Sequence, residues 1–395
     1  MRSGSDKNDI IRAMKRFVAV MNIPSPYRLH LLGELARQLE ERGISLECHF
    51  MAKGHADRPK SWLNPTIPFR HRYWRDWGVG QNHFNPGLIV RLMLHRPDYL
   101  LVGGTYDALT SIFVSLTARA ELKMCWIEGN AKSPGRLTGL KAWIKYLTIS
   151  KYELMAVPGQ QGVAFLELLA QHTTRPFPKP IILPNLVDET RFGSAQRDKR
   201  GCFDVDDVTR VCLIPSRFDP VKGLKEFFSA VEPATLLGWK LVVMGHGPEE
   251  ESTLKIVRDR GLESFVRVIH SVAYDEMPRY YASADLCLIP SIRDQNPLAA
   301  VEALHSGLPL ALSDQAGNVD EAVADGRNGW VLPVGDVEAY RRKLVSIWQT
   351  PLDRLREMGR ISQQENAAFW RTQAAIAGFV DGVLGLRSSA LGCRS

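Results

Sequence analysis

Short apolar segments alternate with longer segments of helical periodicity along most of the chain. In the first half, runs rich in apolar and β-branched residues predict five strands, at 16–21, 45–50, 99–102, 123–127 and 153–157. Between the first two, a helix is predicted over 29–42, because four leucines fall on one of its faces: Leu31, Leu32, Leu35 and Leu39. Such alternation is typical of a parallel sheet with helices on both faces.

The same alternation is clearer in the second half. Six further strands are predicted there, at 208–215, 240–244, 266–270, 285–290, 308–312 and 330–332. Helical periodicity between them predicts four helices, at 224–231, 249–260, 275–282 and 298–305. The fold class is therefore α/β, with two Rossmann-like, doubly wound domains facing across a cleft. Ligands of such open sheets bind outside the carboxyl ends of the strands.

The length of 395 residues also favours two domains. At 183–188 a strand ends in turn-forming residues, so we place a hinge there. We expect a flexible start at 1–14, an N-terminal domain at 15–185 and a C-terminal domain at 186–365. The last residues, 366–395, are expected to form a helix that returns to the N-terminal domain, followed by a tail.

Basic residues concentrate in the first half. Residues 1–190 carry 25 Lys and Arg against 16 Asp and Glu, whereas 191–395 carry 25 against 27. This bias suits an anionic partner, such as lipid headgroups or a diphosphate-linked molecule, and a solvated basic surface is the plain alternative. Because no nucleic-acid reader motif is recognisable, no nucleic-acid partner is expected.

Composition disfavours several other classes of protein. The six cysteines are scattered, without a C-x-x-C pair or a His/Cys cluster at metal-ligand spacing, so no metal site is expected. The polar start and two early prolines argue against a signal peptide, and no run approaches the ~20 apolar residues of a membrane-spanning helix. We therefore expect a cytoplasmic protein, with any membrane contact peripheral and at the inner face of the cytoplasmic membrane.

Two loops of the second half carry candidate binding residues just after predicted strands. Arg217 and Lys222 follow 208–215, where two cations can clamp a diphosphate, although solvated cations of a surface loop are the alternative. Gly245 and Gly247 follow the next strand and allow the backbone to approach a ligand closely. His246, between them, is interpreted as a loop residue and not as an acid or base.

The most informative segment is 290–309. Asn296 is a good N-cap, Pro297 suits a first helical turn and Gly307 suits the end of a helix over 298–305. The free N–H groups and the positive end of this helix would stabilise an anion.

Two carboxylates flank the start of the same helix. Asp294 lies in the preceding loop and Glu302 lies eight residues later, on the second turn. Each carboxylate can accept hydrogen bonds from vicinal hydroxyls, so the two can hold opposite ends of one ligand.

Together these motifs resemble the family 4 glycosyltransferases, large retaining enzymes of the GT-B fold, over most of the chain and most strongly at 182–333. Each motif is weak alone, but the linked series is specific. It comprises Pro184-Asn185, Asp188, Arg217, Lys222-Gly223, Gly245-His246-Gly247-Pro248, Tyr280 to Asp285, Pro290-Ser291, Asp294 to Glu302, Gly307 to Pro309 and Asn328-Gly329.

The resemblance implies a retaining hexosyltransferase with a nucleotide-sugar donor, UDP-linked in preference to GDP-linked, and no required metal or cofactor. By this resemblance Arg217 and Lys222 bind the donor diphosphate, and Glu302 binds the ribose hydroxyls. Asp294 takes the place of the first Glu of the family's E-x7-E motif, near the transferred sugar.

The remaining donor-binding residues also follow from the resemblance. Backbone groups of Asn296, Pro297 and Leu298 would hold sugar hydroxyls or phosphate, and His270 and Ser271 end the strand that lies near the base. The Gly245–Gly247 loop completes this set.

The sequence departs from the family pattern at three places. Asp in place of Glu at 294 withdraws the carboxylate by ~1.5 Å, and a misplacement of ~1 Å can cost on the order of 100-fold in rate, unless the backbone compensates. The glycine-rich first loop is replaced by 22–28, from which Arg28 could reach the diphosphate or serve a structural role. Where many members carry a His, this chain has Glu128, a candidate for contacting the reacting sugar or acceptor.

The acceptor is expected to bind the N-terminal domain. Segments 68–77 and 136–145 mix cations with aromatics, and Leu140, Trp143, Ile144 and Leu147 share one helical face. That face fits either a membrane interface or the protein core. The pattern favours a peripheral enzyme that acts on a glycan or lipid-linked acceptor in cell-envelope polysaccharide biosynthesis.

Three alternatives stay open. A nucleotide-sugar 2-epimerase of the same fold would consume donor without an acceptor, and a catalytically weak binding protein would bind donor without turnover. A dinucleotide oxidoreductase is disfavoured because no G-x-G-x-x-G follows the first strand.

Overall fold

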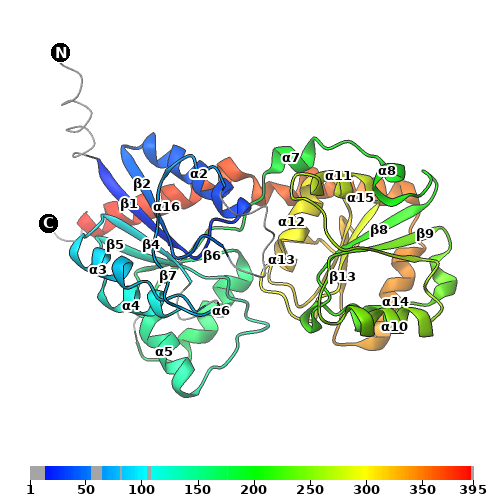
Figure 1. Ribbon diagram of the computed structural model, residues 1–395, viewed down its shortest axis with the longest axis horizontal. Helices are drawn as coiled ribbons and strands as arrows, with labels where there is room; N and C mark the ends of the chain where they lie inside the picture. Colours follow the sequence, from blue (N-terminus) through cyan, green and yellow to red (C-terminus); the bar gives the residue numbers. More distant parts are fainter. Residues whose placement is uncertain (1–13, 55–64, 81, 105–107, 176, 393–395) are drawn as a thin grey trace, which may run out of the picture. The chain divides into compact units, whose positions relative to one another are not determined.

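The computed structural model describes residues 14–54, 65–80, 82–104, 108–175 and 177–392 (Figure 1). The chain divides into two compact units, one of Met1–Leu186 with Thr372–Ser395 and the other of Val187–Arg371. The flexible start predicted at 1–14 lies outside the described residues except for its last position.

The first unit, which we call unit 1, is built on a seven-stranded parallel sheet in the order β3-β2-β1-β4-β5-β6-β7. Its strands are β1 (Lys15–Met21), β2 (Ile44–Phe50), β3 (Arg70–Tyr73), β4 (Tyr99–Gly103), β5 (Leu122–Trp126), β6 (Leu154–Val157) and β7 (Lys179–Ile182). The sequence pattern does not predict β3, because this edge strand reads Arg-His-Arg-Tyr and lacks apolar alternation.

Helices cover both faces of this sheet. They are α2 (Pro26–Glu40), α3 (Pro86–Leu94), α4 (Leu109–Thr117), α5 (Gly139–Ile149), α6 (Gln160–Ala170) and α16 (Thr372–Gly392). Helices α2 and α16 pack together on one face, and α3 to α6 lie on the other (Figure 1). Just after the end of α2, Arg42 forms an ion pair of 2.8 Å with Asp381 of α16.

The second unit, unit 2, contains a six-stranded parallel sheet in the order β10-β9-β8-β11-β12-β13. Its strands are β8 (Arg210–Pro215), β9 (Trp239–Met244), β10 (Val266–Ile269), β11 (Leu286–Ile289), β12 (Leu310–Ser313) and β13 (Gly329–Leu332). The central strands are apolar and buried because helices cover both faces. All six strands predicted for this half are confirmed, with ends that differ by one or two residues.

The helices of unit 2 form two layers. The α-helices are α7 (Glu189–Gly193), α8 (Lys199–Phe203), α9 (Leu224–Ala230), α10 (Glu250–Asp259), α11 (Met277–Ser283), α12 (Leu298–His305), α13 (Val319–Ala322), α14 (Val337–Trp348) and α15 (Leu352–Gln364). The 3-10 helices are η2 (Pro220–Lys222), η3 (Pro233–Leu236) and η4 (Asn366–Trp370). Helix α9 packs against α10 and α14, whereas α12 packs against α7, α11 and α15. Strand order reverses between β8 and β11, and such a switch point is where open α/β sheets bind ligands.

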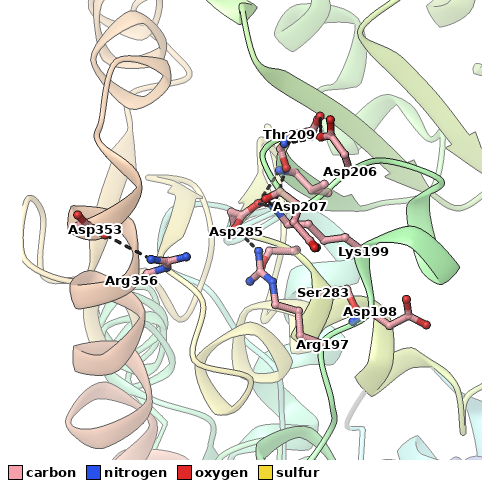
Figure 2. A network of polar contacts seen from close by, with 12 residues as sticks. Arg197, Asp198, Lys199, Asp206, Asp207, Thr209, Ser283, Asp285, Asp353 and Arg356 are labelled. Carbon is pink, nitrogen blue, oxygen red and sulfur yellow. Dashed lines mark hydrogen bonds and ion pairs between the residues drawn. The ribbon is translucent and has the colours of Figure 1, made fainter.

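A buried ion pair fastens α8 to the amino ends of β8 and β11 (Figure 2). Lys199 Nζ lies 2.8 Å from Asp285 Oδ2, and both side chains are almost completely buried. The same oxygen accepts a hydrogen bond of 2.8 Å from the Val211 amide, and Arg197 binds the other carboxylate oxygen. This network lies at the opposite end of the strands from the candidate site.

No helix within the described residues is both long and apolar enough to cross a membrane.

Candidate functional site

The loops after β8 and β11 meet at the switch point of unit 2. Gly223 ends η2 with a φ of +68°, and a Cβ built there would lie 2.4 Å from the Pro290 carbonyl oxygen. Only glycine therefore allows the two loops to approach this closely. The approach brings Lys222 to Asp294.

Lys222 and Asp294 form an ion pair that is mostly shielded from solvent. Lys222 Nζ lies 2.6 Å from Asp294 Oδ2, and the side chains are 24% and 12% exposed. Ser291 Oγ lies 3.3 Å from the same oxygen, and the Asp294 carbonyl accepts a hydrogen bond of 3.1 Å from the Gly317 amide. The structure thus brings together two residues that the sequence placed at one site, with the carboxylate directed at the lysine.

Arg217 does not share this contact. Its guanidinium pairs with Asp219 at 2.6 Å, and its side chain is 60% exposed. Of the two cations that the sequence assigned to a diphosphate, only Lys222 pairs with Asp294 between the two loops, whereas the Arg217 side chain is largely exposed to solvent.

Glu302 lies on α12, in a less polar setting. The Tyr281 hydroxyl donates a hydrogen bond of 2.6 Å to Glu302 Oε2, and Tyr281 is fully buried. Although part of the Glu302 side chain keeps some exposed surface, protein atoms surround its carboxyl group, and this burial raises its pKa to about 7. The Tyr281 hydrogen bond acts in the opposite direction and lowers the pKa.

Two tyrosines near Glu302 received no role from the sequence. Tyr281 belongs to a family motif, but its bond to Glu302 spans 21 positions and is not visible in the sequence. Burial, followed by the charge of Glu302, raises the pKa of Tyr274 to about 12. The positions of Tyr274 and Tyr281 in the sequence do not show that their side chains lie near the Glu302 carboxylate.

The start of α12 corrects one prediction. Pro297 occupies the N-cap position and Leu298 the first helical position, so the prediction that Asn296 caps the helix is wrong. Pro297 has an extended ψ of 110° and supplies no side-chain acceptor. The end of the helix is as predicted: Gly307 follows the C-cap, and its amide donates to the Leu304 carbonyl at 3.1 Å.

Asn296, which does not cap α12, is buried beside the start of this helix. Its side chain is 8% exposed, and neither Oδ1 nor Nδ2 has a hydrogen-bond partner among the described residues. An unsatisfied buried amide is costly, so a ligand hydroxyl or phosphate oxygen is a suitable partner for it. Sequence analysis had assigned only its backbone.

The loop after β9 packs against the loop after β8. A Cβ at Gly247 would lie 2.6 Å from the Phe218 carbonyl oxygen, and the Phe218 amide donates to the His246 carbonyl at 3.2 Å. Gly245 is crowded in the same way, because a Cβ there would lie 2.4 Å from the Ser216 carbonyl oxygen. Because Gly245 and Gly247 have no side chain, the two loops can pack closely against each other.

The predicted histidines lie at the outer side of these loops. His246 Nδ1 lies 3.2 Å from the His270 carbonyl oxygen, and His270 Nε2 lies 2.6 Å from Glu250 Oε1. The His270 side chain is 64% exposed. Ser271 follows it in the same segment, just after β10.

Arg28 and Glu128 form a separate cluster in unit 1, at the carboxyl ends of β1 and β5. The Arg28 guanidinium lies over the Trp126 ring, 3.7 Å from its centroid, and donates to Glu128 Oε1 at 3.1 Å. Asn185 Nδ2 donates to the same oxygen at 2.9 Å. Sequence analysis missed this contact of Asn185, which lies 57 positions from Glu128.

In the part of the chain that the structure describes, no group of three or more His, Cys, Asp or Glu side chains is arranged to hold a metal ion.

Comparison with known proteins gives a family and a fold. The family described as "Glycosyl transferases group 1" matches residues 197–365, the range that holds the unit 2 site. A D-inositol 3-phosphate glycosyltransferase of Streptomyces avermitilis is 30% identical over 378 residues, which cover 87% of this chain and 80% of the relative.

A second relative is the amylovoran biosynthesis glycosyltransferase AmsK of Erwinia amylovora, 28% identical over 121 residues, or 29% of this chain. For AmsK and two other curated relatives the match spans 30%, 49% and 51% of their length. Among solved structures, Anabaena Alr3699/HepE in complex with UDP and glucose has a TM-score of 0.71 at 15% identity, over 94% of this chain and all of that one. A likeness at this identity shows the two-sheet GT-B fold.

Proposed function

The chain belongs to the group 1 glycosyltransferases, and from this premise we propose that it transfers a sugar, with retention of configuration, from a nucleotide-sugar donor bound in unit 2. The observation that carries the proposal is the Lys222–Asp294 ion pair at the switch point. The unsatisfied Asn296 amide follows two residues later in the same loop, and Glu302 lies on the adjoining helix. A cation, an unsatisfied amide and a buried carboxylate match the diphosphate and hydroxyls of such a donor.

We propose that Lys222 and the start of α12 bind the diphosphate. The first N–H groups of a helix have no intrahelical acceptor, and its positive end favours an anion. Negative charge develops on the departing nucleotide during transfer, so both groups stabilise the transition state more than the ground state. Arg217 adds its charge when it leaves Asp219 for a phosphate oxygen.

Asp294 then has a positioning role in addition to any contact with the sugar. Its carboxylate holds Lys222 Nζ at 2.6 Å, which restricts the lysine side chain and reduces the entropy lost when the lysine binds a phosphate. We propose that the close approach of the loops at Gly223 compensates for the shorter side chain of Asp294.

Glu302 is proposed to accept hydrogen bonds from the ribose hydroxyls. These donors favour the ionised carboxylate, so donor binding lowers the raised pKa of Glu302 and is strengthened as pH rises through about 7. Retention needs the acceptor hydroxyl on the face from which the nucleotide departs, where a phosphate oxygen can take its proton.

For the substrates, we propose a UDP-linked hexose in preference to a GDP-linked one, and a glycan or lipid-linked acceptor of cell-envelope polysaccharide biosynthesis. Similarity to a relative named for amylovoran biosynthesis supports the second part. Glu128 of unit 1 is the proposed contact with the reacting sugar or the acceptor. For Arg28 we propose the structural role, because it donates a hydrogen bond to the Glu128 carboxylate at 3.1 Å.

The test is a transfer assay with UDP-glucose, UDP-galactose, UDP-N-acetylglucosamine and GDP-mannose, each radiolabelled in the sugar, with and without a bacterial lipid and glycan extract. We expect acceptor-dependent transfer from one donor, with the product of the same anomeric configuration. Consumption of donor without acceptor and with formation of an epimer would identify a 2-epimerase, and binding without turnover would identify a binding protein.

A further inference from the structure

Exposed apolar side chains are concentrated on one layer of unit 1. Of the fourteen large hydrophobic side chains that are exposed in the described residues, eight lie on three consecutive helices, α3, α4 and α5. Single exposed hydrophobic residues are ordinary, whereas a contiguous group indicates an interaction surface.

Helix α4 carries the clearest stripe. Leu109, Phe113 and Leu116 are 48%, 43% and 42% exposed and follow one another at intervals of four and three residues. This spacing places all three on one face of the helix. On α3, the exposed residues Val90, Met93 and Leu94 show the same pattern at its last turns.

Helix α5 decides between the two interpretations that the sequence left open for its apolar face. Leu140 and Trp143 are 73% and 52% exposed, and Ile144 and Leu147 are only partly buried. The opposite face, with Ala142 and Ile149, fills the core. Core packing therefore does not account for this face.

The three stripes form one surface. Helix α3 packs against α4, and α4 packs against α5, on the face of the sheet opposite α2 and α16 (Figure 1). The Phe84 and Phe113 rings, 6.2 Å apart, extend the contact between α4 and the segment before α3. We call the exposed residues of these helices the α3–α5 surface.

The charged residues around the α3–α5 surface indicate which kind of partner it binds. None of the three helices contains an Asp or Glu, and exposed cations lie on or beside them at Arg119, Arg136 and Lys141. An apolar face with a tryptophan and a basic rim is the pattern that inserts into the headgroup region of an anionic bilayer. A second copy of the chain is a poorer occupant, because a two-fold contact would bring the same basic rims together.

We propose that the α3–α5 surface docks unit 1 on an anionic lipid bilayer. The inference concerns a part of the molecule remote from the donor site of unit 2 in sequence, and it holds whether or not the proposed transfer reaction is correct.

The test compares binding of the full chain to vesicles of phosphatidylcholine alone and of phosphatidylcholine mixed with phosphatidylglycerol, by co-sedimentation at low and high salt. The variant Leu94→Ser/Phe113→Ser/Trp143→Ser removes one side chain from each helix. The matched control Val208→Ser/Leu237→Ser/Val337→Ser removes three side chains of unit 2 that are 81%, 72% and 59% exposed. Circular dichroism verifies that both variants are folded.

We expect the wild type and the control to bind the anionic vesicles, with weaker binding at high salt, and the α3–α5 variant to lose roughly tenfold or more in partition coefficient. Failure of the wild type to bind, or equal loss in the control, would overturn the proposal. Sedimentation velocity covers the remaining case: a wild-type dimer that the α3–α5 substitutions dissociate, without vesicle binding, would assign the surface to a second copy.

Discussion

At the scale of single residues, two opposing effects act on the charge of the Glu302 carboxylate. Its burial against Tyr281 penalises the charged carboxylate, yet the proposed contact with ribose hydroxyls requires that charge. A binding residue that is unfavourable until its ligand arrives lowers the stability of the free protein. The pH dependence of stability measures this effect directly.

Replacement Glu302→Gln is therefore expected to stabilise the free protein at pH 8 and to change its stability by no more than about 1 kcal/mol at pH 5. Between pH 4.5 and 7 the Glu302 carboxyl, with a pKa of about 7, keeps a proton that the unfolded chain, with an ordinary pKa of 4.5, has released. The free energy of unfolding therefore falls as pH rises from 4.5 to 7. The full effect is at most about 3 kcal/mol, or several degrees in Tm. Thermal unfolding at the two pH values measures it, and an equal shift at both would contradict the raised pKa.

What the sequence predicts at this scale depends on separation along the chain. Asp294 and Glu302 are eight positions apart on one loop and helix, and Lys222 follows a recognisable strand, so spacing sufficed to propose them. The contact of Asn185 with Glu128 joins distant segments, and only the fold brings these two side chains together. The N-cap prediction for Asn296 failed because Pro297 already fixes the start of the helix.

At the scale of elements, close loop packing holds the site in shape. Substitution Gly247→Ala is expected to lower the unfolding free energy by about 1–3 kcal/mol, because a Cβ there meets the Phe218 backbone at 2.6 Å. The control Gly335→Ala places its Cβ in open space and should be neutral or slightly stabilising. Chemical denaturation of both variants checks this, and equal losses would exclude the steric cause.

The buried ion pair of Lys199 and Asp285, which tethers α8 to the sheet, gives a second prediction at the same scale. Asp285→Asn leaves Lys199 charged and buried without its counter-ion, so we expect a loss of about 3–5 kcal/mol in stability with no change in nucleotide affinity. Asp353→Asn, shown in the same view, is the control, because Asp353 is 95% exposed and should change stability by less than about 0.5 kcal/mol (Figure 2). Weakened nucleotide binding by folded Asp285→Asn would show that the tether also shapes the site.

At the scale of the whole molecule, periodicity predicted the α/β class and nearly every strand, because strands buried on both faces are continuous apolar runs. Periodicity gave no range for β7 and did not predict β3, because an edge strand of polar residues is held by pairing with β2 and not by its own pattern. The basic excess of the first half suits an anionic partner, and the structure adds the exposed apolar α3–α5 surface, for which we propose an anionic bilayer.

In the proposed donor site, unit 2 binds a nucleotide sugar through Lys222 and Glu302. Calorimetric titration of UDP, GDP and ADP into the wild type, Lys222→Ala and Glu302→Ala tests it, with Lys343→Ala as the control, because Lys343 is also a half-buried lysine paired with an aspartate of unit 2. We expect one nucleotide to bind the wild type and the control equally, and to bind Lys222→Ala and Glu302→Ala about 10–100-fold more weakly. If no nucleotide binds the wild type, or if both site variants bind as tightly as it does, the donor site is not the one described.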